Sequence, residues 1–270
     1  MLKNIRNHLC KSEKSVGENN NHKIHNFPFN FPHKKLSLFV FKIYFADLSD
    51  NSVLDSFLST FIQNSRNLNM KKALIIVDVQ NDFCEGGALA VPEANEVIPY
   101  INLLMEENEY DQIVLTQDWH PANHKSFASN NDRKVGESII LNGIPQFMWP
   151  DHCVQGTFGA EFHKDLNRDK VTHIIQKGKN TEIDSYSGFQ DNNHFMKTGL
   201  DDFLKYHEIQ LVEIVGLAMD YCVKFTCLDA VANGYITCLH FNGTKAVNVK
   251  PDNGRDAIYE MIQKGVTVLG

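Results

Sequence analysis

The sequence lacks both a cysteine framework and a stretch long enough to cross a membrane. Its six cysteines form no CxxC pair, and no secretory signal precedes them, which together indicate a reducing compartment. The longest apolar run, residues 36–45, is interrupted by Lys42 and is about half of the roughly 20 residues that a spanning helix needs. We therefore expect a protein of the cytoplasm, with the nucleus as an additional compartment, and no membrane partner.

Positive charge is scarce after residue 69. Residues 1–69 hold 9 Lys and Arg against 5 Asp and Glu, whereas residues 70–270 hold 17 against 28. An acidic body of this kind disfavours nucleic-acid binding. Residues 1–69 also contain 11 asparagines and little hydrophobic periodicity, so we predict an irregular, mostly disordered N-terminal extension there. One domain is expected over residues 70–270.

From residue 70 onward, short apolar segments alternate with helical patterns. Apolar runs that are hydrophobic on both faces are typical of parallel strands covered by helices. The predicted strands are 73–77, 113–117, 172–176, 211–215, 236–240 and 266–269, and the predicted helices are 93–107, 159–167, 199–207, 221–233 and 252–264. The pattern predicts an α/β fold, a three-layer sandwich around a six-stranded, mostly parallel sheet. Residues 123–150 are expected to form a loop or hairpin insertion.

Cys222 follows the fourth predicted strand at the point where a helix is expected to begin. The first turn of a helix has unpaired N–H groups and a partial positive charge, which favour a thiolate and offer donors to an oxyanion. Cys222 is therefore a candidate nucleophile. A buried cysteine that only fills space fits this stretch equally well.

Polar residues also follow the other predicted strands. Ligands of open parallel sheets collect at the carboxyl ends of the strands, and there the sequence has Asp78, Asp118 and Lys177. Each has an ordinary alternative, as a turn former or a solvated charge. Because the ends of parallel strands lie along one edge, we expect a carboxylate, a lysine and Cys222 to meet in one crevice.

A second group of residues is suited to metal binding. Asp118 and His120 are two residues apart on an extended segment, and His152 could complete three ligands and leave open positions for substrate and water. Twelve histidines in one chain also make chance clusters common, so the spacing alone leaves both interpretations open.

Five motifs follow one another in residues 70–270. They are Asp78-Val79-Gln80-Asn81-Asp82-Phe83, Asp118-Trp119-His120-Pro121-Ala122-Asn123-His124, Trp149-Pro150-Asp151-His152-Cys153, Lys177-Gly178 with Tyr186-Ser187-Gly188-Phe189, and Asp220-Tyr221-Cys222-Val223. Together they resemble the motifs of the nicotinamidases in the isochorismatase-like cysteine hydrolase superfamily. The order and number of the motifs make the resemblance specific.

The resemblance implies an isochorismatase-like fold and a full set of site residues. It implies a catalytic triad of Asp78, Lys177 and Cys222, an oxyanion hole of the Ala218 and Cys222 N–H groups after a cis Leu217–Ala218 peptide, and a pyridine ring held by Phe83, Trp119 and Tyr186. It further implies a divalent metal, zinc with iron or manganese as alternatives, on Asp118, His120 and His152, with His124 as an additional candidate.

The implied activity is hydrolysis of nicotinamide to nicotinate and ammonia through a cysteine thioester, in NAD salvage. Pyrazinamide is expected as a further substrate, and a homo-oligomer as the assembly. The alternative is another isochorismatase-like amidohydrolase that acts on a different small amide.

Overall fold

The computed structural model describes residues 70–270. The predicted extension over residues 1–69 lies outside the described residues. Within residues 70–270, no helix combines the length and the apolar character that crossing a bilayer requires.

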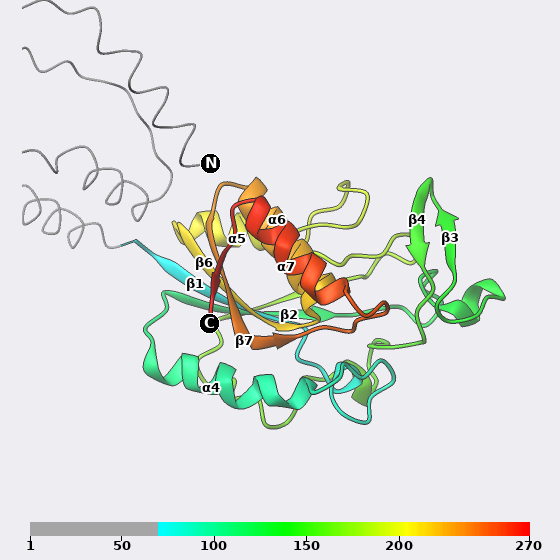
Figure 1. Ribbon diagram of the computed structural model, residues 1–270, viewed down its shortest axis with the longest axis horizontal. Helices are drawn as coiled ribbons and strands as arrows, with labels where there is room; N and C mark the ends of the chain where they lie inside the picture. The colour runs from blue at the N-terminus through cyan, green and yellow to red at the C-terminus, as the bar shows by residue number, and fades with distance from the viewer. Residues whose placement is uncertain (1–69) are drawn as a thin grey trace, which may run out of the picture. The chain divides into compact units, whose positions relative to one another are not determined.

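The six predicted strands form one sheet, in which every neighbouring pair is parallel (Figure 1). The sheet order is β5-β2-β1-β6-β7-β8. The strands are β1 (Lys72–Val77), β2 (Gln112–Asp118), β5 (His173–Lys177), β6 (Leu211–Leu217), β7 (Ile236–Lys245) and β8 (Thr267–Leu269). The predicted fold class is confirmed, and the sheet is parallel throughout.

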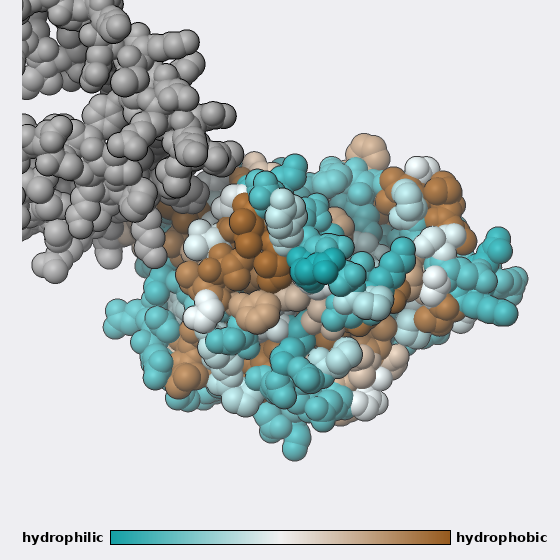
Figure 2. Space-filling model, in the orientation of Figure 1, coloured by the Kyte–Doolittle hydropathy of each residue, from teal (hydrophilic) through white to brown (hydrophobic). Residues whose placement is uncertain are grey.

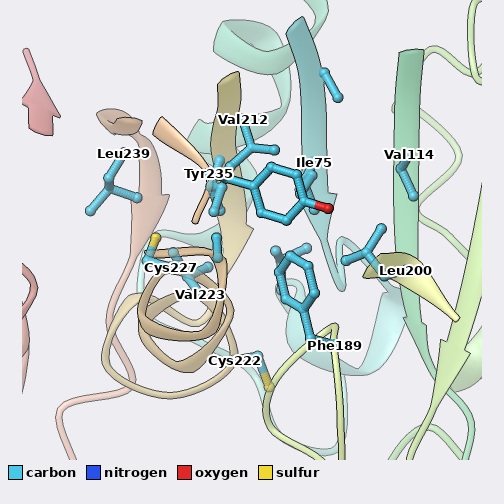
Figure 3. Close-up of a cluster of buried hydrophobic side chains, with 14 of the residues drawn as sticks. Ile75, Val114, Phe189, Leu200, Val212, Cys222, Val223, Cys227, Tyr235 and Leu239 are labelled. Atoms are coloured by element: carbon cyan, nitrogen blue, oxygen red, sulfur yellow. The ribbon is translucent and has the colours of Figure 1, made fainter. Parts of the chain in front are cut away.

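Helices cover both faces of this sheet, which gives three layers (Figure 1). The helix α4 (Val97–Glu107) packs on one face, and α5 (Leu200–Tyr206), α6 (Lys224–Ala232) and α7 (Asn253–Gln263) pack on the other. Strand β1 divides its side chains between the two cores, with Ile75 facing α5 to α7 and Ile76 facing α4. Figure 3 shows the core on the side of α5, α6 and α7, with Phe189 and Cys222 at one end of it.

The surface carries hydrophobic residues in separate places. In the face drawn in Figure 2, hydrophilic residues predominate and brown residues gather in a patch near the C-terminus. Large apolar side chains such as Phe158, Phe195 and Tyr206 are individually exposed. Single exposed apolar residues are normal on folded proteins.

The predicted insertion contains a β-hairpin. Strands β3 (Ser138–Leu141) and β4 (Ile144–Phe147) pair antiparallel across Asn142 and Gly143. Both turn residues have positive φ, 50° and 85°, which is the conformation that an Asn-Gly hairpin turn requires.

The helix predicted over residues 159–167 is absent. Only a 3-10 turn, η4 (Phe158–Ala160), forms in that region. Beyond it the backbone pairs with the segment after β1, because Asn81 N–H donates to Glu161 C=O and His163 N–H donates to Val79 C=O. Phe162 is therefore buried by an extended bridge to Gln80 and Leu166 by the turn that follows, since tertiary pairing overrides the local helical pattern.

Candidate active site

The polar residues predicted at the strand ends do meet at one edge of the sheet. The ammonium group of Lys177, at the end of β5, lies 2.8 Å from Asp78 Oδ2, 3.2 Å from Asp118 Oδ1 and 3.4 Å from Cys222 Sγ. It also donates to the carbonyl of Ser185 at 2.9 Å. Lys177 is 1 % exposed, which is rare for a lysine and requires this set of acceptors.

The pKa values of this cluster are set by burial and by the lysine that both carboxylates contact. Burial raises the pKa of Asp78 above its ordinary value, and Lys177 opposes the shift without cancelling it. Burial alone would raise the pKa of Asp118 as well, but His120 and Lys177 hold that pKa well below the usual range. The pKa of Lys177 is raised in turn, because the two carboxylates outweigh its own burial. Asp118 is therefore the permanent anion, and Asp78 is the carboxylate prepared to take a proton.

Cys222 sits in a π-helical turn, η5 (Met219–Val223), between β6 and α6. Its thiol is 7 % exposed, and burial raises its pKa well above the ordinary value, while Lys177 acts in the opposite direction. The position of Cys222 at the start of a helix predicted a thiolate. Burial outweighs that effect and the charge of Lys177, so the resting form of Cys222 is the neutral thiol. The Asp78 carboxylate, the base available for its proton, contacts the same Lys177 ammonium group, with Asp78 Oδ2 at 2.8 Å and Cys222 Sγ at 3.4 Å from Lys177 Nζ.

The peptide before this turn is cis, between Leu217 and Ala218, as the resemblance implied. Ala218 and Cys222 both line the same pocket. Their backbone N–H groups belong to the start of a helical segment, where amide donors and the helix dipole favour negative charge. Gly216, just before the cis peptide, has φ +111°, and a Cβ there would come within 2.1 Å of the Val77 carbonyl oxygen.

Asp118, His120 and His152 present ligand atoms within metal-binding distance of one another. Asp118 Oδ2 lies 3.1 Å from His120 Nε2 and 3.6 Å from His152 Nε2. The Nδ1 atoms of the histidines contact carbonyls, Gly178 C=O at 2.9 Å and Pro150 C=O at 2.7 Å, so in the neutral rings Nδ1 carries the proton and Nε2 keeps its lone pair. Buried His120 Nε2 has no hydrogen-bond partner among the described residues. This donor set fits a divalent metal ion.

His124 is oriented differently from the other two histidines. Its Nδ1 lies 2.7 Å from the Ser126 hydroxyl and 3.1 Å from the Ser126 N–H, in place of a backbone carbonyl. Burial lowers the pKa of His124 to about 4, so the ring is neutral near pH 7. Its buried Nε2 has no hydrogen-bond partner among the described residues. With His120 and Asp184, His124 forms a second group of metal-capable residues beside the first.

An aromatic pocket opens beside Cys222 and the histidines. It is lined by Phe83, Leu89, Asp118, Trp149, His152, Asp184, Tyr186, Ala218, Tyr221, Cys222 and Val247. Of the three aromatic residues predicted to hold a ring, Phe83 and Tyr186 line this pocket, while Trp119 is not among the lining residues and packs against the core under α4.

Sequence reasoning assigned no role to Trp149 and Tyr221, which both line the pocket. Trp149 Nε1 donates to Tyr186 Oη at 3.1 Å, and Tyr221 packs edge-on against Trp149 and Tyr186 at centroid distances of 4.9 and 5.5 Å. Both residues lie inside the quoted motifs, Tyr221 directly before Cys222 and Trp149 three residues before His152, and that proximity was the available signal.

Comparison with known proteins places these features in a family. Residues 72–270 match the family model described as Isochorismatase domain. The nicotinamidase of Escherichia coli (strain K12) is 45% identical over 199 residues, which cover 73% of this chain and 93% of that protein.

Two solved structures are also similar. The nicotinamidase/pyrazinamidase of Acinetobacter baumanii superposes with a TM-score of 0.71 at 44% identity, covering 74% of this chain and 96% of that one. The pyrazinamidase of Pyrococcus horikoshii in complex with zinc gives a TM-score of 0.59 at 37% identity, covering 74% and 98%. With the family model matched over nearly the whole described region, the chain belongs to the isochorismatase family.

Proposed function

We propose that this protein hydrolyses nicotinamide to nicotinate and ammonia, and that it serves NAD salvage. The observation that carries the proposal is the position of Lys177, which contacts Asp78 and Cys222 on one side and the metal-capable residue Asp118 on the other. A nucleophile, a proton acceptor and a metal site thus share one aromatic pocket. Similarity to nicotinamidases from several organisms supports the same conclusion.

Asp118, His120 and His152 would hold one divalent metal, for which we propose zinc because a relative was solved with that ion. When bound, the metal supplies a Lewis-acid position for the pyridine nitrogen and polarises water in the pocket. His124 lies beside this set and stays the additional candidate ligand, because with His120 and Asp184 it forms a second group of metal-capable residues.

The chemistry begins with transfer of the Cys222 thiol proton to Asp78. Cys222 Sγ then attacks the amide carbonyl carbon, and the N–H groups of Ala218 and Cys222 donate to the oxygen that becomes negative. Asp78 passes the proton to the amide nitrogen, the C–N bond breaks and ammonia leaves, which forms a thioester. Lys177 keeps its charge throughout and stabilises whichever of Asp78 and Cys222 is anionic.

Hydrolysis of the thioester uses the same groups in a second round. Asp78 takes a proton from water as the water oxygen attacks the thioester carbonyl, and the oxyanion is held by the same two N–H groups. The C–S bond breaks, the proton on Asp78 returns to the sulfur, and the nicotinic acid that leaves gives its proton to solvent and becomes nicotinate. The cycle leaves the enzyme unchanged and consumes one amide and one water.

Phe83, Tyr186 and Trp149 line the pocket, and on this proposal they would hold the flat pyridine ring. Pyrazinamide has the same ring size and retains a ring nitrogen, so we propose that it is accepted too. A nucleophilic thiol needs reducing conditions, which supports a cytoplasmic location. Assembly into a homo-oligomer stays a prediction.

Release of ammonia from nicotinamide by the purified protein tests the proposal, with Cys222→Ala as the comparison. We expect turnover by the wild type and none by the variant, while nicotinamide binding persists because the aromatic lining and the metal-capable residues are unchanged. Cys227, a residue of α6 that packs into the core, supplies the control, since Cys227→Ala should keep its turnover. Turnover of the Cys222 variant within tenfold of wild type would refute the nucleophile, and activity only on another small amide would favour the alternative substrate.

A further inference from the structure

Two polar residues in the segment after β1 take no part in the chemistry above. Gln80 is completely buried, and Asp82 lies in the 3-10 turn η1 (Asn81–Phe83). Each makes at least one hydrogen bond to the backbone of a segment that carries a metal-capable residue.

The side-chain amide of Gln80 bonds to the backbone of Asp118 on both sides. Its Oε1 accepts the Asp118 N–H at 2.7 Å, and its Nε2 donates to the Asp118 carbonyl at 2.8 Å. A continuing β1 strand would make these bonds with its own backbone, but the chain turns away at Asp78, where φ is +48°. Gln80 therefore extends the β1–β2 ladder by one residue and fixes the end of β2.

The carboxylate of Asp82 holds the residue that follows His152. Asp82 Oδ2 accepts the Cys153 N–H at 2.7 Å, and Oδ1 accepts the Ala88 N–H at 3.2 Å. Cys153 has φ +48°, a conformation that residues with a side chain adopt rarely and only with support from their surroundings. Asp82 therefore fixes the backbone from which His152 projects.

We propose that Gln80 and Asp82 are positioning residues of the metal site, each of which fixes the main chain under one ligand. The inference rests on the proposed function, because it assumes that Asp118 and His152 bind the metal. Through this arrangement the single segment 78–82 supplies the proton acceptor and aligns the metal site with it. Loss of groups that orient metal ligands typically weakens metal binding about 10- to 100-fold.

Gln80→Met tests the first half of the proposal, and Gln117→Met is its matched control. Both glutamines donate through Nε2 to the carbonyl of Ala160 at 2.9 Å, but only the Gln80 side chain bonds to the backbone of Asp118. The full-length proteins, freed of metal, are titrated with Zn²⁺ against a chelator of known affinity. We expect the Kd for Zn²⁺ to rise about 10- to 100-fold in Gln80→Met and less than about threefold in Gln117→Met.

Asp82→Ala tests the second half, and Asp82→Asn is the rescue. The alanine variant leaves the Cys153 N–H without its acceptor, whereas the asparagine variant can still offer a carbonyl oxygen to it. We expect the same 10- to roughly 100-fold weakening of Zn²⁺ binding in Asp82→Ala and recovery of most of it in Asp82→Asn. The visible spectrum of the Co²⁺-loaded proteins should change with the alanine variant, because it reports the coordination geometry and not the general stability.

Unchanged Kd and spectrum in Gln80→Met and Asp82→Ala would overturn the proposal. An equal loss of Zn²⁺ affinity in Gln117→Met would also overturn it, because that result would indicate a general loosening around Ala160. So would a failure of Asp82→Asn to restore Zn²⁺ binding, because that result would indicate that the charge of Asp82 matters and not its hydrogen bond. If Gln80→Met fails to fold, the Asp82 pair decides. A wild type that binds neither Zn²⁺ nor Co²⁺ would instead refute the metal site itself, so the two failures are distinguishable.

Discussion

Replacing Lys177 by methionine should destabilise the fold strongly. Lys177 is the cation for Asp78 at 2.8 Å and Asp118 at 3.2 Å, and all three side chains are buried. Methionine keeps the length of the side chain and removes the charge, so two buried carboxylates lose their partner. Removing one member of a buried ion pair costs about 3–5 kcal/mol. At about 2–4 °C per kcal/mol for a domain of this size, we expect Tm to fall by roughly 6–20 °C.

The pKa shifts also predict how this loss depends on pH. In the wild type the pKa of Asp118 is held well below its ordinary value, so its ionised form stabilises the fold above the unfolded pKa, near 3.9, and this contribution disappears as the pH falls through the folded pKa. Without Lys177 the folded pKa of both Asp78 and Asp118 rises. A raised pKa makes the fold lose stability as the pH increases above the unfolded pKa. The Lys177→Met defect should therefore be larger at pH 8 than at pH 5.

Urea unfolding at both pH values, in the presence of a chelator, measures this difference. Lys125→Met is the control, because Lys125 makes an ion pair of 2.6 Å with Glu182 in which the side chains are 43 % and 48 % exposed. Removal of an exposed pair should cost at most about 1 kcal/mol. A Lys177→Met protein within about 1 kcal/mol of wild type at both pH values would refute the assignment of a buried ionised cluster.

Two further predictions concern the substrate and the domain boundary. Benzamide lacks the ring nitrogen, so the enzyme should hydrolyse nicotinamide up to roughly 10⁴ to 10⁵ times faster than benzamide. His152→Ala or removal of the metal by a chelator should abolish most of that preference, and equal rates of hydrolysis of both amides by the wild type would refute the metal contact. A protein that starts at Met70 should keep full ammonia release, because β1 begins at Lys72 and the site lies wholly in the described residues; loss of activity in a folded Met70 protein would contradict this.

The sequence predicted the sheet because both faces of its strands are covered. The run Ala73 to Val77 is completely buried, so its apolar composition carries an unambiguous signal. The segment 159–167 carries no such signal, because its backbone pairs with residues 79–81, a contact that depends on how the whole chain folds. Strand β7 likewise runs on to Lys245, past the predicted end at residue 240, since Thr244 and Lys245 pair with Gly216 and Leu217.

The site was predictable where chemistry follows directly from strand ends. Asp78, Lys177 and Cys222 come from three different strands, and parallel topology brings them together. The lining of the pocket was harder, because Trp149 and Tyr221 reach it only through the packing of the insertion against the η5 turn. The protonation state of Cys222 could not be predicted from the sequence either, because burial in the folded protein raises the pKa of the thiol against the effect of Lys177.

The covalent intermediate provides the most direct test of the account. Wild-type protein is mixed with nicotinamide, quenched with acid within the first turnovers, and digested for peptide mass mapping. The account predicts a nicotinoyl group on the peptide that contains Cys222, and none on the peptides of Cys84, Cys153, Cys227 or Cys238. Steady release of ammonia without any acyl group on Cys222, or with the group on another residue, would contradict it.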